Sequence, residues 1–183
     1  GLLMINALDT SSFIVKNKTQ KDDYAIVSAK CLITNKDSIW YAKSSPNLFD
    51  VLAEVLSQEF FRVLIPYQPK SLFVKTPQKK EYHIYSEEIP KYQSLRICLK
   101  SNLDFKSFEG LGYVLVSALF LMENDLHDDN IGINHQNQFV KIDGGECLRY
   151  ATQAHQKMKL SLEILQQLPF LNLDNYKISN WLD

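Results

Sequence analysis

The chain has 183 residues, and its 20 lysines and arginines nearly balance its 21 aspartates and glutamates, which gives a formal charge of −1. This balance argues against a protein that binds nucleic acid through a basic surface, and the length allows one domain or two small lobes with a buried core. Three separated cysteines fit a reducing compartment better than a disulfide framework or a zinc site. With no transmembrane-length apolar run and no signal-peptide pattern, the chain is expected to be soluble.

The first part of the chain predicts an antiparallel sheet. Phe13–Val15, Tyr24–Ile33 and Ile39–Lys43 are rich in β-branched and aromatic residues, which favour strands. Polar turns are expected between them, at Lys16–Asp23 and Thr34–Ser38. Neither turn contains a glycine.

An amphipathic helix is predicted next, with Ser45 or Asn47 as its N-cap and its end near Leu64, before Pro66. A hairpin follows, with strands at 72–74 and 82–86. It leads directly into an acidic connector at Glu87–Pro90 and a polar passage at Lys91–Ser107, in which a turn is the most that we expect.

The second half of the chain is predicted to be mainly helical. Phe108–Met122 is the most apolar helix and is apolar nearly all round, which places it at the centre of a lobe. Further helices are predicted at Thr152–Leu168 and, more briefly, at Leu173–Leu182. Asp125 follows shortly after the end of the first of these three helices.

The stretch from Asp125 to Asp143 has the strongest chemical signal. Asn130 lies five residues after Asp125, and Asp143 lies thirteen residues after Asn130. Short strands at Ile131–Ile133 and Gln138–Ile142 fold Asp143 back beside Asn130. Phosphoryl transfer needs a carboxylate near the acceptor hydroxyl and oxygen ligands for Mg²⁺, so Asp125 is predicted to orient the hydroxyl, and Asn130 and Asp143 to hold the metal. The alternative is that these residues only form turns, in which Asp, Asn and Gly are common.

The same residues resemble a known family. Asp125-x-His127-x-x-Asn130, followed by Ile142-Asp143, is similar to the D-R-H-x-x-N and I-D-F-G motifs of phosphatidylinositol 3- and 4-kinase-like enzymes. The wider pattern resembles kinase-like effector proteins that intracellular bacterial pathogens secrete into host cells. The resemblance covers roughly Tyr24 to Leu148.

The resemblance implies an α+β, two-lobed protein kinase-like fold. Residues 1–88 would form a β-rich lobe with one long helix, and residues 89–183 a short helical lobe with the catalytic loop, together one minimal kinase-like domain. Backbone groups of Glu88 and Ile89 would bind adenine at the hinge between the lobes.

The resemblance also implies roles for individual side chains. Lys43 would bind the phosphates of ATP, held by Glu54 or alternatively by Glu59, because the helical periodicity does not choose between them. Asp125 would be the catalytic aspartate. His127 would stabilise developing charge or relay a proton, unless it only packs and hydrogen-bonds within the loop.

The implied activity is an ATP- and Mg²⁺-dependent phosphotransferase that acts in the host-cell cytoplasm. Its acceptor would be a hydroxyl of a host protein, a phosphoinositide or an inositol phosphate. The sequence departs from the family pattern at Gly144, where an aromatic residue is usual, and only 38 residues follow Gly145. The glycine-rich loop that covers the phosphates of ATP in protein kinases is also missing. The short tail and the missing glycine-rich loop favour an alternative, a pseudokinase that binds nucleotide or a host protein. A kinase-fold AMP transferase is a further alternative, because a fold alone does not fix the chemistry.

Overall fold

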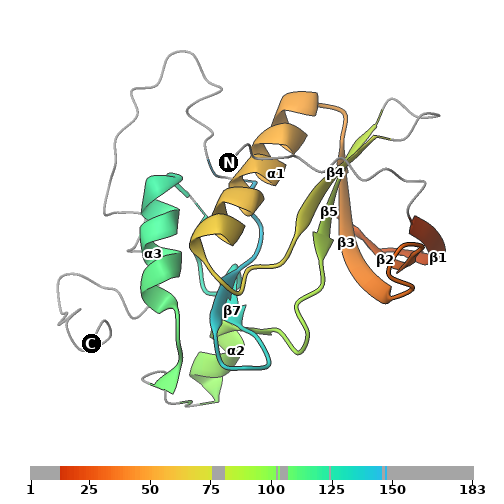
Figure 1. The fold of residues 1–183 in the computed structure, drawn as a ribbon. Helices are drawn as coiled ribbons and strands as arrows, with labels where there is room; N and C mark the ends of the chain where they lie inside the picture. Colours follow the sequence, from red (N-terminus) through yellow and green to blue (C-terminus); the bar gives the residue numbers. More distant parts are fainter. Residues whose placement is uncertain are drawn as a thin grey trace, which may run out of the picture. The chain divides into compact units, whose positions relative to one another are not determined.

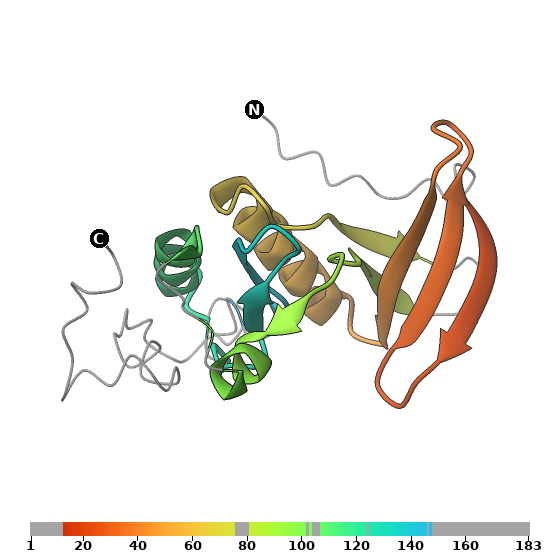
Figure 2. The same cartoon turned by 90° about the horizontal axis from the view of Figure 1, so that it is seen from below.

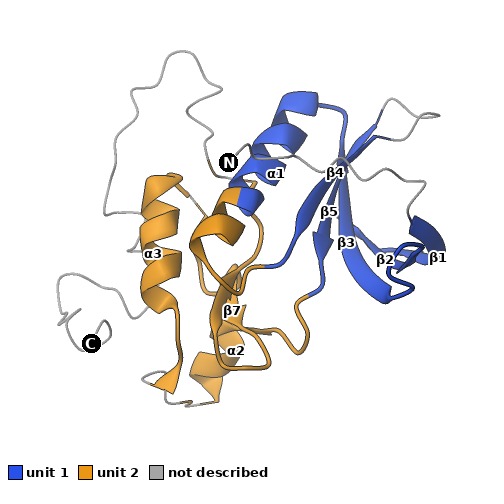
Figure 3. Ribbon diagram, viewed as in Figure 1, with its two compact units in different colours: residues 1–59, 69–88 blue, residues 60–68, 89–183 orange. Residues whose placement is uncertain are grey.

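The structure is a computed structural model with an α+β architecture (Figure 1). The chain divides into two compact units (Figure 3). Unit 1 consists of residues 1–59 and 69–88, and unit 2 consists of residues 60–68 and 89–183. The boundary after Glu88 lies where the sequence suggests a hinge. The structure describes residues 13–75, 81–101, 103, 107–123, 125–145 and 147.

Unit 1 contains a five-stranded antiparallel sheet with the strand order β1-β2-β3-β5-β4. The first three strands form a meander, and β4 and β5 form the hairpin that the sequence predicts, which is therefore confirmed (Figure 2). The strands are β1 Phe13–Gln20, β2 Ala25–Cys31, β3 Asp37–Ser45, β4 Ser71–Lys75 and β5 Tyr82–Glu87.

Strand β1 is longer than predicted. Most of the stretch Lys16–Asp23, which was expected to be a turn, continues the strand, and its pairing with β2 reaches Gln20 opposite Ala25. Residues 14–20 are exposed, so the period-2 burial pattern that marks a strand is absent. The true turn is short and closes with the Lys21 N–H donating to the Tyr24 carbonyl at 2.7 Å.

Helix α1 spans Leu48–Leu64, which confirms the predicted amphipathic helix and its end before Pro66. Of the two predicted caps, Asn47 is the one that binds the helix start, because its Oδ1 accepts the Phe49 N–H at 3.0 Å. Within unit 1, Val51 and Val55 of α1 pack on Ile84 of β5, and all three are buried.

Among its described residues, unit 2 contains a three-stranded sheet with the order β6-β7-β8, two further helices, and the end of α1 from Phe60 onward. One buried apolar cluster joins α2, α3 and the sheet, and includes Leu95, Val114, Ile131 and Phe139. The elements are β6 Gln93–Ser94, α2 Leu95–Lys100, α3 Leu111–Phe120, β7 Ile131–Ile133 and β8 Phe139–Lys141.

The polar passage at Lys91–Ser107 contains regular structure that the sequence reading missed. Strand β6 has only two residues, and α2 has six, so neither is long enough to show a clear period. Ser94 caps α2 by accepting the Ile97 N–H at 3.4 Å. Leu95 and Cys98 of α2 are buried, which anchors this short helix in the core.

Helix α3 is shorter than the predicted Phe108–Met122. It begins after Gly110, which has a left-handed φ of 93°, because the preceding Glu109 pairs with the strand segment at Gln138. The sequence places this apolar helix at the centre of a lobe, but only part of its surface is buried. Its Leu111, Val114, Leu115, Ser117 and Ala118 are buried, but Tyr113, Val116 and Phe120 are more than half exposed.

The predicted helices at Thr152–Leu168 and Leu173–Leu182 lie outside the described residues. Among the described residues, no helix has the length and apolar character that a bilayer crossing requires. The α+β class is therefore established, with an antiparallel sheet in unit 1 and short helices in unit 2.

Gly132 in β7 is required by close packing. A Cβ atom there would lie 2.3 Å from the Gln93 carbonyl oxygen and 2.5 Å from Cε2 of Tyr92. Tyr92 cannot move away freely, because its ring is largely buried and its hydroxyl donates a hydrogen bond to the Asp129 carbonyl at 3.2 Å. The same burial raises the pKa of the Tyr92 hydroxyl.

We therefore expect Gly132→Ala to lower the free energy of unfolding by about 1–3 kcal/mol, because overpacking forces the backbone of β6 away. Urea denaturation followed by circular dichroism measures the change. The matched control is Gly112→Ala within α3, where alanine favours the helix and stability should not fall. Equal stability of the two variants would contradict the packing argument.

Candidate functional site

The candidate catalytic residues of unit 2 lie on a loop between α3 and β7. Helix α3 ends at Phe120 with Leu121 as its C-cap, and Met122 reverses the chain with a left-handed φ of 50°. The Glu123 N–H then donates to the Ala118 carbonyl at 2.9 Å, which fixes the start of the loop against the helix. The loop ends in a turn in which the Asn130 N–H donates to the His127 carbonyl at 3.0 Å.

Three predicted site residues, Asp125, His127 and Asn130, converge within this loop. Nδ2 of Asn130 donates to the backbone oxygen of Asp125 and to its carboxylate Oδ2, both at 3.0 Å. Nε2 of His127 lies 3.5 Å from the other carboxylate oxygen, Oδ1. The Asp125 carboxylate is thus held by two side chains while it stays partly exposed.

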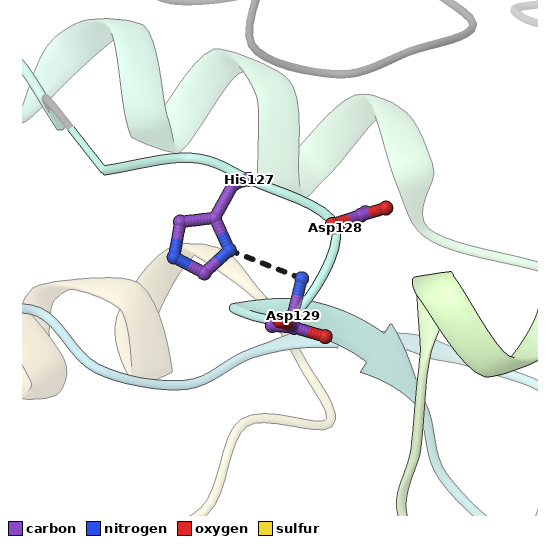
Figure 4. Close-up of side chains that lie close together, drawn as sticks. All are labelled: His127, Asp128 and Asp129. Carbon is purple, nitrogen blue, oxygen red and sulfur yellow. Dashed lines mark hydrogen bonds between the residues drawn. The ribbon is translucent and has the colours of Figure 1, made fainter.

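The contacts of His127 define which ring nitrogen carries the proton. Nδ1 accepts the backbone N–H of Asp129 at 3.1 Å (Figure 4). In a neutral imidazole, which has one donor and one acceptor nitrogen, this bond leaves the proton on Nε2, which faces Asp125. Nε2 also lies 3.1 Å from Nδ2 of Asn130.

The β7–β8 hairpin brings the second aspartate back to this loop. Ile131 pairs with Lys141, and the Ile142 N–H donates to the Asn130 carbonyl at 2.8 Å. The prediction that the hairpin folds Asp143 back beside Asn130 is confirmed. Asp143 has a left-handed φ of 57°, and its Oδ1 accepts the Gly145 N–H at 3.2 Å.

Asn130 and Asp143 fit a magnesium site by the chemistry of their donors. Mg²⁺ prefers oxygen ligands and is commonly held by one or two side chains together with water and substrate phosphates. The hydrogen bonds of the Asn130 side chain described above use its nitrogen and not its oxygen. An amide oxygen and a carboxylate on adjacent ends of one hairpin are therefore a suitable pair.

A second group of polar side chains has a different explanation. Ligand atoms of His127, Asp128 and Asp129 lie within 4.8 Å of one another (Figure 4). Arg96 of α2 pairs with both aspartates, at 2.9 Å from Nη2 to Asp128 and 2.8 Å from Nη1 to Asp129, and the bond to Asp128 raises the pKa of the guanidinium. The ion pairs with Arg96 therefore account for the gathering of these two carboxylates.

In unit 1, the structure selects the partner of Lys43. Nζ of Lys43 lies 2.8 Å from Oε1 of Glu54, whose side chain is only 11% exposed. Glu59, the alternative, instead accepts the backbone N–H of Ser71 at 2.7 Å. The strand β3 thus carries a lysine that is held by a carboxylate of α1.

The stretch at the unit boundary was predicted to bind adenine through backbone groups. The Glu88 N–H donates to the Ile39 carbonyl at 2.9 Å, and the Ile89 carbonyl accepts the Tyr92 N–H at 3.2 Å. The Glu88 N–H is therefore committed to the fold. Adenine binding by backbone groups of Glu88 and Ile89 stays a prediction.

Two residues next to the site were missed from the sequence. Glu123 and Lys141 are 0% and 1% exposed, and Oε2 of Glu123 lies 2.5 Å from Nζ of Lys141. The sequence carries little signal for this pair, because a lysine in a short strand normally faces water. The one signal in the sequence is that Lys141 lies two residues before Asp143.

Comparison with known proteins identifies the family. No curated protein sequence matches the chain. The sequence model of the LepB N-terminal domain matches residues 51–180. That stretch includes Glu54 and the loop and hairpin from Glu123 to Asp143, whereas Lys43 precedes it. Because the match covers well over half of the 183 residues, the chain belongs to the LepB N-terminal domain family.

Proposed function

We propose that this protein is an ATP- and Mg²⁺-dependent phosphotransferase with a two-lobed kinase-like fold. It moves the γ-phosphate to a hydroxyl of a lipid, an inositol phosphate or a protein. The observation that carries the proposal is the convergence of Asp125 and Asn130 in one loop, with Asp143 returned to Asn130 by the β7–β8 hairpin. The resemblance to secreted effectors extends the proposal to acceptors in a host cell.

In this proposal, Asp125 acts on the acceptor. Its carboxylate orients the hydroxyl and accepts the proton as the oxygen attacks phosphorus, while ADP leaves with the bridging oxygen. Asn130 and His127 keep the carboxylate in place through the contacts at 3.0 Å and 3.5 Å. The Nε2–H of His127 also offsets negative charge near the transferred group.

Asn130 and Asp143 are the residues that would hold the metal. Bound Mg²⁺ would neutralise charge on the phosphates of the nucleotide. In unit 1, Glu54 holds the ammonium group of Lys43, which we assign to the nucleotide phosphates. This last assignment is supported by the ion pair within unit 1 alone.

Label transfer from ATP tests the proposal and its metal dependence. The purified chain is incubated with Mg²⁺ and a host-cell extract, with the label on the γ-phosphate or, separately, on the α-phosphate. We expect γ-label to move to an acceptor and the transfer to stop when EDTA removes the metal. Chromatography of the product as lipid, soluble phosphate or protein identifies the acceptor class.

Two outcomes would replace the proposal by its alternatives. Transfer of the α-label would identify an AMP transferase. Binding of ATP, measured by calorimetry, with no movement of either label would identify a binding module. Transfer that persists in EDTA would contradict the role of Asn130 and Asp143.

The Lys43–Glu54 pair makes a separate prediction. Loss of one charged hydrogen bond to the phosphates is expected to raise the KM for ATP about 10- to 100-fold in Lys43→Met. Glu54→Gln should raise it in the same direction by a smaller factor, because Lys43 keeps its charge. The matched control is Glu59→Gln, which removes the charge from an acceptor of the Ser71 N–H and should leave the KM nearly unchanged. Equal effects at Glu54 and Glu59 would contradict the assignment.

A further inference from the structure

The buried ion pair of Glu123 and Lys141 is not explained by stability alone. Both side chains are almost completely buried, and their charged atoms lie 2.5 Å apart. Removal of two charges from water is unfavourable, and apolar residues of similar volume often stabilise a protein as well or better. The other contacts of the pair point to a positional role.

The Glu123 end of the pair reaches the catalytic loop. Its Oε1 accepts the backbone N–H of Asp125 at 2.9 Å. Its Oε2 accepts hydrogen bonds from Nζ of Lys141 and from the Sγ–H of Cys147, the latter at 3.0 Å. Both carboxylate oxygens are therefore used, and one of them fixes the backbone of the proposed catalytic aspartate.

The Lys141 end of the pair reaches the proposed metal-binding aspartate. Besides Glu123, its Nζ donates to the carbonyl oxygens of Ile142 at 2.9 Å and of Asp143 at 2.6 Å. The ammonium group has three hydrogens, so these three acceptors account for all of them. Asp143 has the left-handed backbone that L-residues rarely adopt, and the ammonium group stabilises its carbonyl in that position.

The backbone of Lys141 is fixed as well. Its N–H donates to Oε1 of Gln68 at 3.0 Å, and Nε2 of Gln68 donates back to its carbonyl. Its Nζ lies 5.0 Å from the centre of the Phe61 ring, a favourable cation–π distance. The lysine therefore has little freedom to change its position.

We infer that Glu123 and Lys141 are positioning residues, which couple the backbone of Asp125 to the backbone of Asp143 through one buried ion pair. The coupling holds the group that acts on the acceptor at a fixed distance from the group that holds the metal. The inference rests on the proposed function for the roles of the two aspartates. The contacts that carry it join only residues of unit 2.

Two variants and a stability control test the inference. Lys141→Met removes the donors to Asp143, and Glu123→Gln keeps an oxygen for the Asp125 N–H but removes the charge. Val140→Ala truncates a buried neighbour in β8 that is not part of the pair, and reports a general loss of packing. Two measurements are made on each folded variant, amide hydrogen exchange at Asp125 by NMR and the Mg²⁺ concentration for half-maximal transfer.

In Lys141→Met we expect the half-maximal Mg²⁺ concentration to rise and kcat to fall by about 10- to 100-fold, as for other residues that orient metal ligands. The KM for the acceptor should change much less. Exchange at the Asp125 amide should be faster than in Val140→Ala, although Lys141 does not contact that amide. For Glu123→Gln, both the exchange rate and the half-maximal Mg²⁺ concentration should lie between the values for wild type and for Lys141→Met. If Lys141→Met does not fold, Glu123→Gln is the variant that tests the inference.

The inference is overturned if the pair variants match Val140→Ala in hydrogen exchange and in Mg²⁺ dependence, because the pair would then only stabilise the core. Failure of the proposed function has a different signature. If wild-type protein moves no label, hydrogen exchange still decides the coupling. Faster exchange at Asp125 in Lys141→Met supports it, and exchange equal to Val140→Ala rejects it.

Discussion

Asp125→Asn is expected to lower kcat for phosphoryl transfer by about 10²–10⁴-fold, the contribution of a well-placed general base. The new amide has nearly the shape of the carboxylate, and its oxygen can still accept the Asn130 Nδ2 bond that is 3.0 Å long in the wild type. The loop should therefore keep its structure, while the negative charge that orients the hydroxyl and accepts its proton is lost. Initial rates of γ-label transfer at saturating ATP and Mg²⁺ measure the effect.

The matched control for this prediction is Asp129→Asn in the same loop. Its side chain is 43% exposed and pairs with the guanidinium of Arg96 at 2.8 Å, whereas its hydrogen bond to His127 is made by the backbone N–H, which the substitution keeps. Exposed ion pairs contribute at most about 1 kcal/mol, so kcat should change less than about fivefold. If Asp125→Asn transferred label as fast as the control, the assignment of Asp125 would fail and a binding module would be the better description.

The sequence predicted the parts of this molecule in which local pattern and tertiary structure agree. Helix α1 has a periodic apolar face, a capping asparagine and a proline after its end, and it forms as expected. The hairpin between Asn130 and Asp143 follows from two short apolar strands and a polar turn, so its pairing was also predictable. The positions of Asn130 and Asp143 in unit 2 depend on this hairpin.

Other features depend on contacts that a linear pattern does not contain. The start of α3 is set by Glu109, which pairs with Gln138 from a distant part of the chain. The choice between Glu54 and Glu59 depends on which side of α1 faces Lys43 and which faces the Ser71 N–H. The burial of Lys141 depends on Glu123, and neither residue alone predicts an ion pair.

Lys141→Met is expected to lower the free energy of unfolding by about 3–5 kcal/mol, because it leaves the Glu123 carboxylate buried without its partner. Glu123 is 0% exposed in the wild type, so water cannot replace the ammonium group without opening the core. The carbonyl oxygens of Ile142 and Asp143 lose a donor at the same time. Urea denaturation followed by tryptophan fluorescence measures the loss.

The double variant Glu123→Leu/Lys141→Met separates stability from positioning. Removal of both charges should recover at least about 2 kcal/mol of the loss in Lys141→Met, since the pair no longer contains an isolated buried charge. Additive losses would instead show that the two side chains do not interact in the folded protein. The Asp125 N–H and the Asp143 carbonyl still lack their partners in the double variant. If the double variant is stable but transfers label slowly, the ion pair serves to position the site residues and is not needed for the stability of the core.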